Sequence, residues 1–160
     1  MRDTATTAAG LAVGLGAAGQ AAKATEDAAG TSRILSYHPD MEYRRLGKTN
    51  IMVSAVGLGG HSRSNDRERA DIISRCMDMG VNYIDACWDN EVKRDAKALK
   101  GRRDKVYLAL SHGAKEVRNE DFRTSNKLLE SLDELLRDSD QDYTDLWRIT
   151  CLEPGGRHTF

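Results

Sequence analysis

The sequence contains few of the residues that mark disulfide-rich, membrane or nucleic-acid-binding proteins. Its three cysteines, Cys76, Cys87 and Cys151, are an odd number with no CxxC pair, which argues against a disulfide framework. The formal net charge is −1, so the charge does not favour nucleic acid or an anionic membrane as a partner. The apolar stretch Ala8–Ala18 is too short to span a bilayer. Charged residues make up 31%, which fits a soluble globular protein with a polar surface.

The N-terminal 24 residues have the layout of a secretory signal peptide. Arg2 precedes the apolar stretch, and Ala22–Ala24 offers an A-x-A-like cleavage site. The stretch resembles the end of a twin-arginine signal without the arginine pair, which predicts that the natural start lies upstream. We therefore expect an exported, periplasmic protein. The alternative is an Ala/Gly-rich tail on a cytoplasmic protein. Residues 25–42 show no periodicity, contain Pro39 and are interpreted as a linker.

From Tyr43 onwards, apolar strand-like segments alternate with helical ones. Tyr43–Leu46 and Ile51–Val53 flank a Gly-Lys-Thr-Asn turn and predict a β-hairpin. The predicted strands that follow are Ser54–Leu58, Val81–Ile84, Val106–Leu110 and Asp145–Ile149, and the predicted helices are Asp66–Met79, Glu91–Lys100 and Phe122–Arg137. Such alternation builds a parallel sheet covered by helices, so the predicted fold class is α/β.

Three stretches in combination resemble a known enzyme family. The segment from Asn82 to Ala109, with NYID and then KALKGRRDKVYLA, resembles the second and third βα units of the aldo-keto reductases. Tyr43–Gly60 resembles their N-terminal hairpin and first strand, and Arg123–Trp147 their third helix and fourth strand. The resemblance implies that residues 43–160 form the N-terminal half of a (β/α)8 TIM barrel. A complete barrel needs about 250 residues, so we expect a truncated chain. Its open strand edges favour self-association of half-barrels.

The resemblance also implies where catalytic residues should lie. The family reduces small-molecule carbonyl substrates with an aspartate, a tyrosine, a lysine and a histidine at the strand ends. Asp85 matches the aspartate, whereas Asn90, Ser111 and Thr150 stand at the positions of the tyrosine, lysine and histidine. A positioned general acid is worth about 10²–10⁴ in rate, and Asn90 has no ionisable proton to give. We therefore expect a catalytically impaired oxidoreductase relative. The alternative is a non-catalytic barrel that serves as a binding or scaffold module.

NADP(H) is the cofactor that the resemblance implies. Gly59 and Gly60 would let a ligand approach the backbone closely, although a tight turn explains these glycines equally well. In such barrels the phosphate site comes from the loops after strands seven and eight, which this sequence does not supply. Cofactor binding by this chain is therefore in doubt.

The predicted strand ends also carry residues suited to other chemistry. Six residues near these ends carry side chains suited to metal binding or nucleophilic attack: His61, Asp85, Cys87, His112, Cys151 and Glu153. The mixture suits zinc or another transition metal, and a Cys–His pair could act as a nucleophile. Because no recognised spacing motif joins them, we predict no metal site and interpret them as packing or loop residues.

One ion pair follows from strand alternation. Arg148 should face the inside of the barrel, on the same side of its strand as Thr150. A buried arginine needs an anion, and Asp85 is the nearest inward candidate. The sequence thus predicts an Asp85–Arg148 pair. The alternative is that Arg148 extends to the open edge of the barrel.

Overall fold

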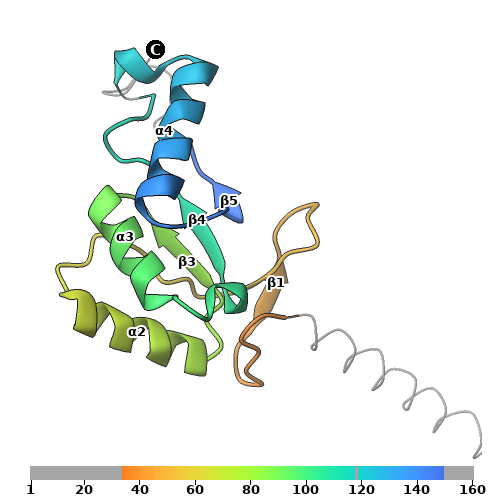
Figure 1. Ribbon diagram of the computed structural model, residues 1–160. Coiled ribbons are helices and arrows are strands. Elements are labelled where there is room, and N and C mark those ends of the chain that lie inside the picture. Colours follow the sequence, from red (N-terminus) through yellow and green to blue (C-terminus); the bar gives the residue numbers. More distant parts are fainter. Residues whose placement is uncertain (1–33, 118, 150–160) are drawn as a thin grey trace, which may run out of the picture. The chain divides into compact units, whose positions relative to one another are not determined.

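The computed structural model describes residues 34–117 and 119–149, which contain a hairpin and a parallel sheet covered by helices (Figure 1). The predicted signal segment, residues 1–24, lies outside the described residues, as do residues 25–33 of the predicted linker and Thr150, Cys151 and Glu153. Within the described part of the chain, no helix is both long and apolar enough to cross a membrane.

The N-terminal hairpin is confirmed. Strands β1 (Tyr43–Arg45) and β2 (Met52–Ser54) pair antiparallel, with Tyr43 opposite Ser54. Gly47 in the connecting turn has a φ of 55°, a left-handed conformation that glycine adopts without a steric penalty.

Asn82 joins this hairpin to the rest of the fold. Its side chain is fully buried, and its Oδ1 accepts a hydrogen bond from the backbone N–H of Ser54 at 2.8 Å. Its Nδ2 donates to the carbonyls of Met52 at 2.9 Å and Leu35 at 3.1 Å. One amide therefore connects the hairpin and residue 35 to the segment that leads into the main sheet.

The main sheet consists of β3 (Tyr83–Ala86), β4 (Tyr107–Leu110) and β5 (Leu146–Trp147), parallel and in that order. This confirms the predicted βαβ arrangement, with strands somewhat displaced or shorter than expected.

The predicted first strand, Ser54–Leu58, is wrong in its extent. Ser54 belongs to the hairpin, and its hydroxyl donates to the Val56 carbonyl at 2.7 Å across a bend. Only Leu58 pairs with β3, through a parallel bridge to Ile84. The chain therefore reaches the sheet at a single residue rather than along a five-residue strand.

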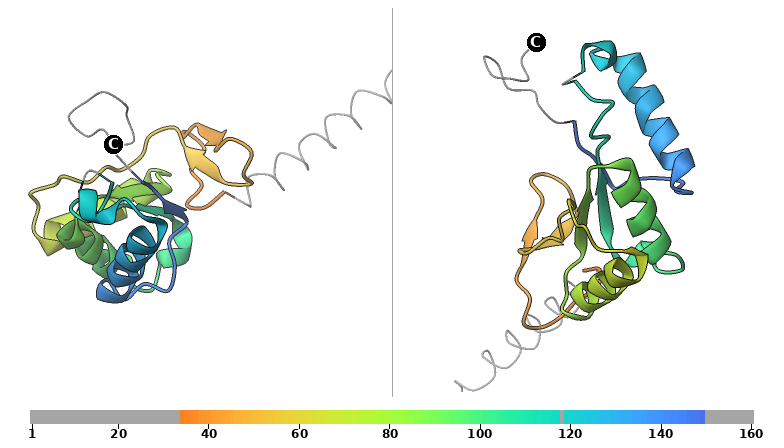
Figure 2. Two further views of the ribbon diagram at one scale, coloured as in Figure 1. Left: turned by 90° about the horizontal axis from the view of Figure 1, so that it is seen from above. Right: turned by 90° about the vertical axis from the view of Figure 1, so that its left-hand side faces the viewer.

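Three helices accompany the strands: α2 (Asp66–Asp78), α3 (Asp89–Ala98) and α4 (Ser125–Asp138), with short 3₁₀ turns η1 (Arg103–Lys105) and η2 (Glu120–Phe122). The helices lie on one face of the sheet (Figure 2). Helix α4 begins three residues later than predicted, because the Thr124 hydroxyl caps it by accepting from the Lys127 N–H at 3.4 Å.

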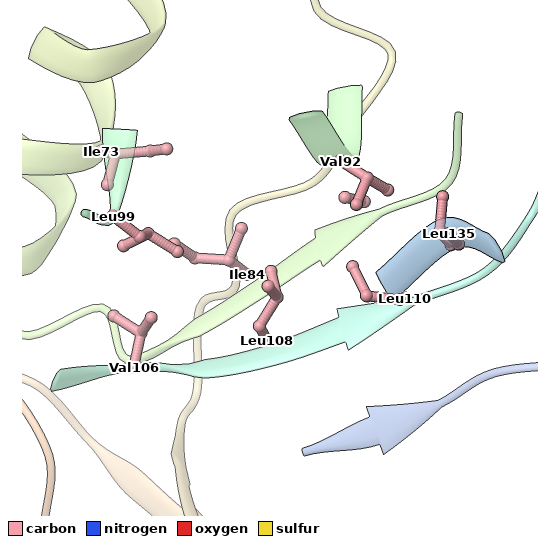
Figure 3. Packing of buried hydrophobic residues seen from close by; sticks show 9 residues of the cluster. Ile73, Ile84, Val92, Leu99, Val106, Leu108, Leu110 and Leu135 are labelled. Carbon is pink, nitrogen blue, oxygen red and sulfur yellow. The ribbon is translucent and has the colours of Figure 1, made fainter. Parts of the chain in front are cut away.

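The apolar core lies between the sheet and the helices (Figure 3). The sheet contributes Ile84, Ala86, Leu108 and Leu110, and the helices and their connections contribute Ile73, Val92, Leu99, Val106 and Leu135. Because side chains alternate along a strand, Tyr83 and Asp85 face the opposite side of the sheet from this core. That opposite side carries the candidate site.

Candidate active site

Arg148 connects the ends of three neighbouring strands. Its Nη2 lies 2.9 Å from Asp85 Oδ1 and 3.2 Å from Ser111 Oγ, and its Nε lies 3.3 Å from the same Asp85 oxygen. Asp85 lies in β3, Ser111 directly follows β4, and Arg148 directly follows β5. The predicted Asp85–Arg148 pair is confirmed, with Ser111 as a further partner. The carboxylate is thus neutralised by an arginine from the end of β5, while the expected lysine position carries a buried, uncharged serine.

The surroundings of Arg148 favour its positively charged form. Burial opposes it, but the hydrogen bond and the charge of Asp85 outweigh burial, so the pKa of Arg148 is raised above its ordinary value, with a smaller contribution from the neighbouring Cys87. The two side chains are 37% and 31% exposed, so solvent screens the pair and its contribution to stability is moderate.

The position at which the resemblance implies a tyrosine carries Asn90. Asn90 is exposed in the first turn of α3, because only Cys87 and Trp88 separate that helix from β3. Tyr83 lies two residues before Asp85 on the same side of β3. Burial raises the pKa of Tyr83, and the negative charge of Asp85 raises it further, against a smaller opposing effect of Arg148. A general acid works best with a pKa near the operating pH, so the raised pKa of Tyr83 makes it less suited to that role.

Gly60 has a structural explanation. A Cβ there would collide with Glu91 Oε2 and would lie 3.3 Å from the Asp85 carbonyl oxygen. The Glu91 carboxylate is buried and accepts hydrogen bonds from the backbone N–H groups of His61, Cys87 and Trp88. Gly60 therefore leaves room for a side chain that satisfies three backbone donors.

Gly59 differs from Gly60, since a Cβ at Gly59 would meet nothing within 4 Å. Its carbonyl accepts a hydrogen bond from Arg69 Nη2 at 3.2 Å. The space beside Gly60 is thus filled by Glu91, and the Gly59 carbonyl is engaged by Arg69.

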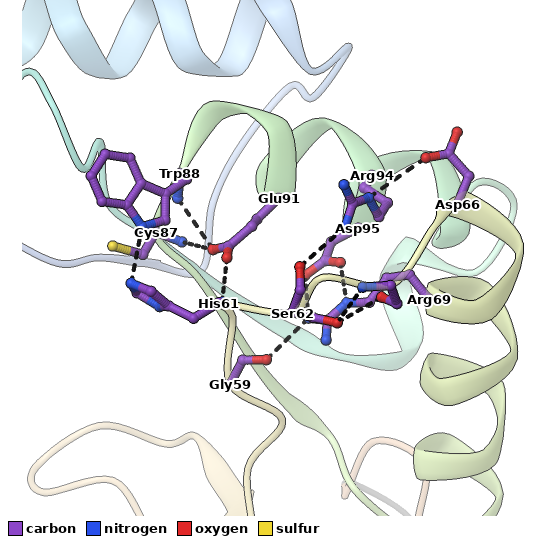
Figure 4. A network of polar contacts seen from close by, with 11 residues as sticks. Gly59, His61, Ser62, Asp66, Arg69, Cys87, Trp88, Glu91, Arg94 and Asp95 are labelled. Atoms are coloured by element: carbon purple, nitrogen blue, oxygen red, sulfur yellow. Dashed lines mark hydrogen bonds and ion pairs between the residues drawn. The ribbon is translucent and has the colours of Figure 1, made fainter.

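The sequence analysis missed a buried ion pair behind this loop (Figure 4). Arg69 of α2 and Asp95 of α3 form two hydrogen bonds, of 2.6 Å from Nε to Oδ1 and 2.8 Å from Nη2 to Oδ2. Their side chains are only 4% and 0% exposed. Arg69 lies one helical turn before the buried Ile73, and this spacing was the available signal that it lies on the buried face.

The described residues do not assemble the nucleophile or the metal site that the strand-end residues could have formed. His112 Nε2 lies 3.2 Å from Asp89 Oδ1, and its Nδ1 accepts from the Lys115 N–H at 3.1 Å. With both nitrogens engaged, His112 has none left to activate Cys87. Within residues 34–117 and 119–149, no group of three His, Cys, Asp or Glu side chains could hold a metal ion. Cys151 and Glu153 lie outside these residues.

Comparison with known proteins gives structural relatives only. No protein-family model matches the sequence, and no curated protein matches it. The holo form of an aldo-keto reductase from Bacillus halodurans matches with 27% identity and a TM-score of 0.58, over 67% of this chain and 39% of that chain. Two structures of a Pseudomonas aeruginosa protein classed with the aldo-keto reductases match with 24% identity and a TM-score of 0.53, over 66% of this chain.

The chain spans less than half of the length of these structures, 39% of the first and 45% of the second. The matches give it an aldo-keto reductase-like α/β fold and support a relationship to oxidoreductases. The described strands do not close into a barrel, which is compatible with one half of such a barrel.

Proposed function

We propose that this chain is an aldo-keto reductase-like relative of the NADP(H) oxidoreductases in which carbonyl reduction is impaired. The observation that supports the proposal is the Arg148 guanidinium, 2.9 Å from Asp85 Oδ1. The family mechanism that the resemblance implies needs a tyrosine whose pKa is lowered by a lysine paired with the aspartate. Here Asp85 is paired with Arg148 instead, and Ser111 carries no charge.

A non-catalytic binding or scaffold module is the second candidate. It is favoured by the way Arg148 uses the former catalytic positions. Asp85 and Ser111 both contact Arg148, so they now stabilise the ends of β3, β4 and β5 against one another. Because Asp85 and Ser111 are bonded to Arg148, they can support the sheet but are less available to a substrate.

The cofactor and substrate follow from the same proposal. NADP(H) and a small-molecule carbonyl are the ligands that the resemblance implies. We expect weak cofactor binding or none, because the Glu91 side chain fills the space beside Gly60 and the Gly59 carbonyl is hydrogen-bonded to Arg69.

The test is an NADPH oxidation assay on the purified full chain with a panel of aldehydes and ketones, and with an active aldo-keto reductase as the positive control. We expect no turnover above that of the buffer. Turnover that Asp85→Ala abolishes would contradict the proposal, whereas turnover that survives this substitution would reveal different chemistry. A fluorescence titration with NADPH, run in parallel, separates loss of binding from loss of the chemical step.

We also propose that the chain self-associates. In the described part of the chain, β5 pairs only with β4, so its other edge presents backbone groups that invite association. Size-exclusion chromatography with light scattering should give a mass above 17.7 kDa. A monodisperse monomer at micromolar concentration would contradict this proposal.

Export is a separate proposal, based on the signal-like residues 1–24. Expression of the full chain in a bacterium, followed by fractionation, should place the shortened product in the periplasm. Recovery of the uncleaved chain in the cytoplasm would contradict it.

A further inference from the structure

Trp88 lies between the ends of successive strands. Its indole Nε1 donates a hydrogen bond to His61 Nε2 at 2.9 Å, and His61 follows the Leu58 bridge (Figure 4). The two rings meet edge to face, with their centroids 6.1 Å apart. On its other side the indole packs against Gly113, where an added Cβ would lie 2.7 Å from the ring. Trp88 therefore links the loop after Leu58 to the loop after β4, at the edge of the sheet where barrel enzymes place their sites.

The chemistry of this contact requires a neutral His61. An indole N–H can only donate, so His61 Nε2 must present its lone pair and the ring proton must lie on Nδ1. Protonation of His61 would turn Nε2 into a donor that faces another donor. His61 also has a φ of 59°, a left-handed conformation that is uncommon for residues other than glycine and that tends to mark functional sites.

The backbone around His61 is held by side chains of α2 and α3. Glu91 of α3 accepts from the His61 N–H, and Arg94 of α3 donates to the Ser62 carbonyl at 3.4 Å. Arg69 of α2 donates to the Gly59 carbonyl at 3.2 Å. Protonation of the His61 ring would therefore leave the loop in place and would break only its contact with Trp88.

Two further titratable groups lie near Trp88. Asp89 follows it in the chain, and its carboxylate contacts the buried His112. Asp89 and His112 form a pair of their own, and the ring nitrogens of His112 contact Asp89 and the Lys115 N–H rather than the indole. His112 is thus a matched control for His61.

We propose that His61 and Trp88 form a pH-sensitive latch, which joins these two strand ends when His61 is neutral and releases the Trp88 indole when His61 is protonated. The latch would change the mobility of Trp88 at this edge of the sheet.

The test uses the two tryptophans of the sequence, Trp88 and Trp147. In the full chain with Trp147→Phe, all tryptophan fluorescence comes from Trp88. When the pH is lowered from about 8 to about 5, its emission should change in one transition. Quenching by acrylamide should rise over the same transition, because release would expose the indole beyond the 38% of the latched state. The transition should remain after the additional change His112→Gln and disappear after His61→Gln, since glutamine can accept the indole N–H without titrating.

If Trp147→Phe perturbs the fold, the unaltered chain answers the same question by NMR. The Trp88 indole N–H resonance should shift with pH, and His61→Gln should remove the shift. A transition that persists without His61, or no transition when His61 is present, would overturn the latch.

Discussion

The Arg69–Asp95 pair offers the sharpest test of how the helices are joined. Asp95→Asn removes the carboxylate charge and leaves the Arg69 guanidinium buried, with its side chain 4% exposed. Breaking a buried pair by removing one partner typically costs about 3–5 kcal/mol, because the remaining charge is uncompensated. Arg69 also hydrogen-bonds the Gly59 carbonyl, so the loss should extend to the loop beside the candidate site.

Urea denaturation of the full chain, followed by circular dichroism, measures this loss. The matched control is Asp138→Asn, which breaks the exposed pair between Asp138 and Lys93, whose side chains are 45% and 44% exposed. An exposed pair contributes about 0–1 kcal/mol. The double change Arg69→Met with Asp95→Leu should recover most of the stability, since apolar side chains often replace a buried pair without loss. If Asp95→Asn costs no more than Asp138→Asn, the reasoning about this pair is refuted.

Three further predictions concern single residues. Gly60→Ala should destabilise the fold by about 1–3 kcal/mol, since its Cβ would collide with Glu91, whereas Gly59→Ala should be nearly neutral in the same denaturation experiment. Burial lowers the pKa of His112, so its neutral form is favoured in the fold. The stability that His112 contributes is complete above the unfolded pKa of about 6.5 and is lost as the pH falls through the lowered folded pKa. Unfolding free energies measured from about pH 7.5 down to about pH 5 should show this loss, and His112→Gln should remove this pH dependence. Asn82→Ala should cost about 2–4 kcal/mol by unfolding, because it leaves the buried Ser54 N–H without this partner and removes the hydrogen bonds to the Met52 and Leu35 carbonyls. A loss below about 1 kcal/mol would contradict its proposed part in fixing the hairpin.

The elements that depend on local pattern were predictable from the sequence. The hairpin, the βαβ unit and the three helices follow from alternating apolar segments and turn residues, and the structure has them all. The extent of the strand at Ser54–Leu58 could not be predicted from the sequence, because it depends on tertiary contacts. Ser54 bonds to Asn82, 28 residues away, and the chain bends before Leu58 reaches β3.

Some contacts of the candidate site could likewise be predicted from the sequence, and others could not. The Asp85–Arg148 pair could be predicted, since strand alternation gives the facing side and electrostatics requires a counter-charge. The His61–Trp88 contact could not, because it depends on a left-handed backbone at His61 that no local pattern indicates. The function of Gly60 was open for a similar reason, since only the structure places the Glu91 carboxylate against it.

The most direct test of the central claim is the coupling free energy between Asp85 and Arg148. The claim is that Asp85 serves as the structural partner of Arg148. Unfolding free energies of the full chain, Asp85→Asn, Arg148→Met and the double variant form a complete cycle. Residues in one ion-pair network typically couple by about 0.5–3 kcal/mol, and the partial exposure of this pair predicts a value near the lower end. A favourable coupling of that size is the expected result, and two single changes whose costs simply add would contradict the account.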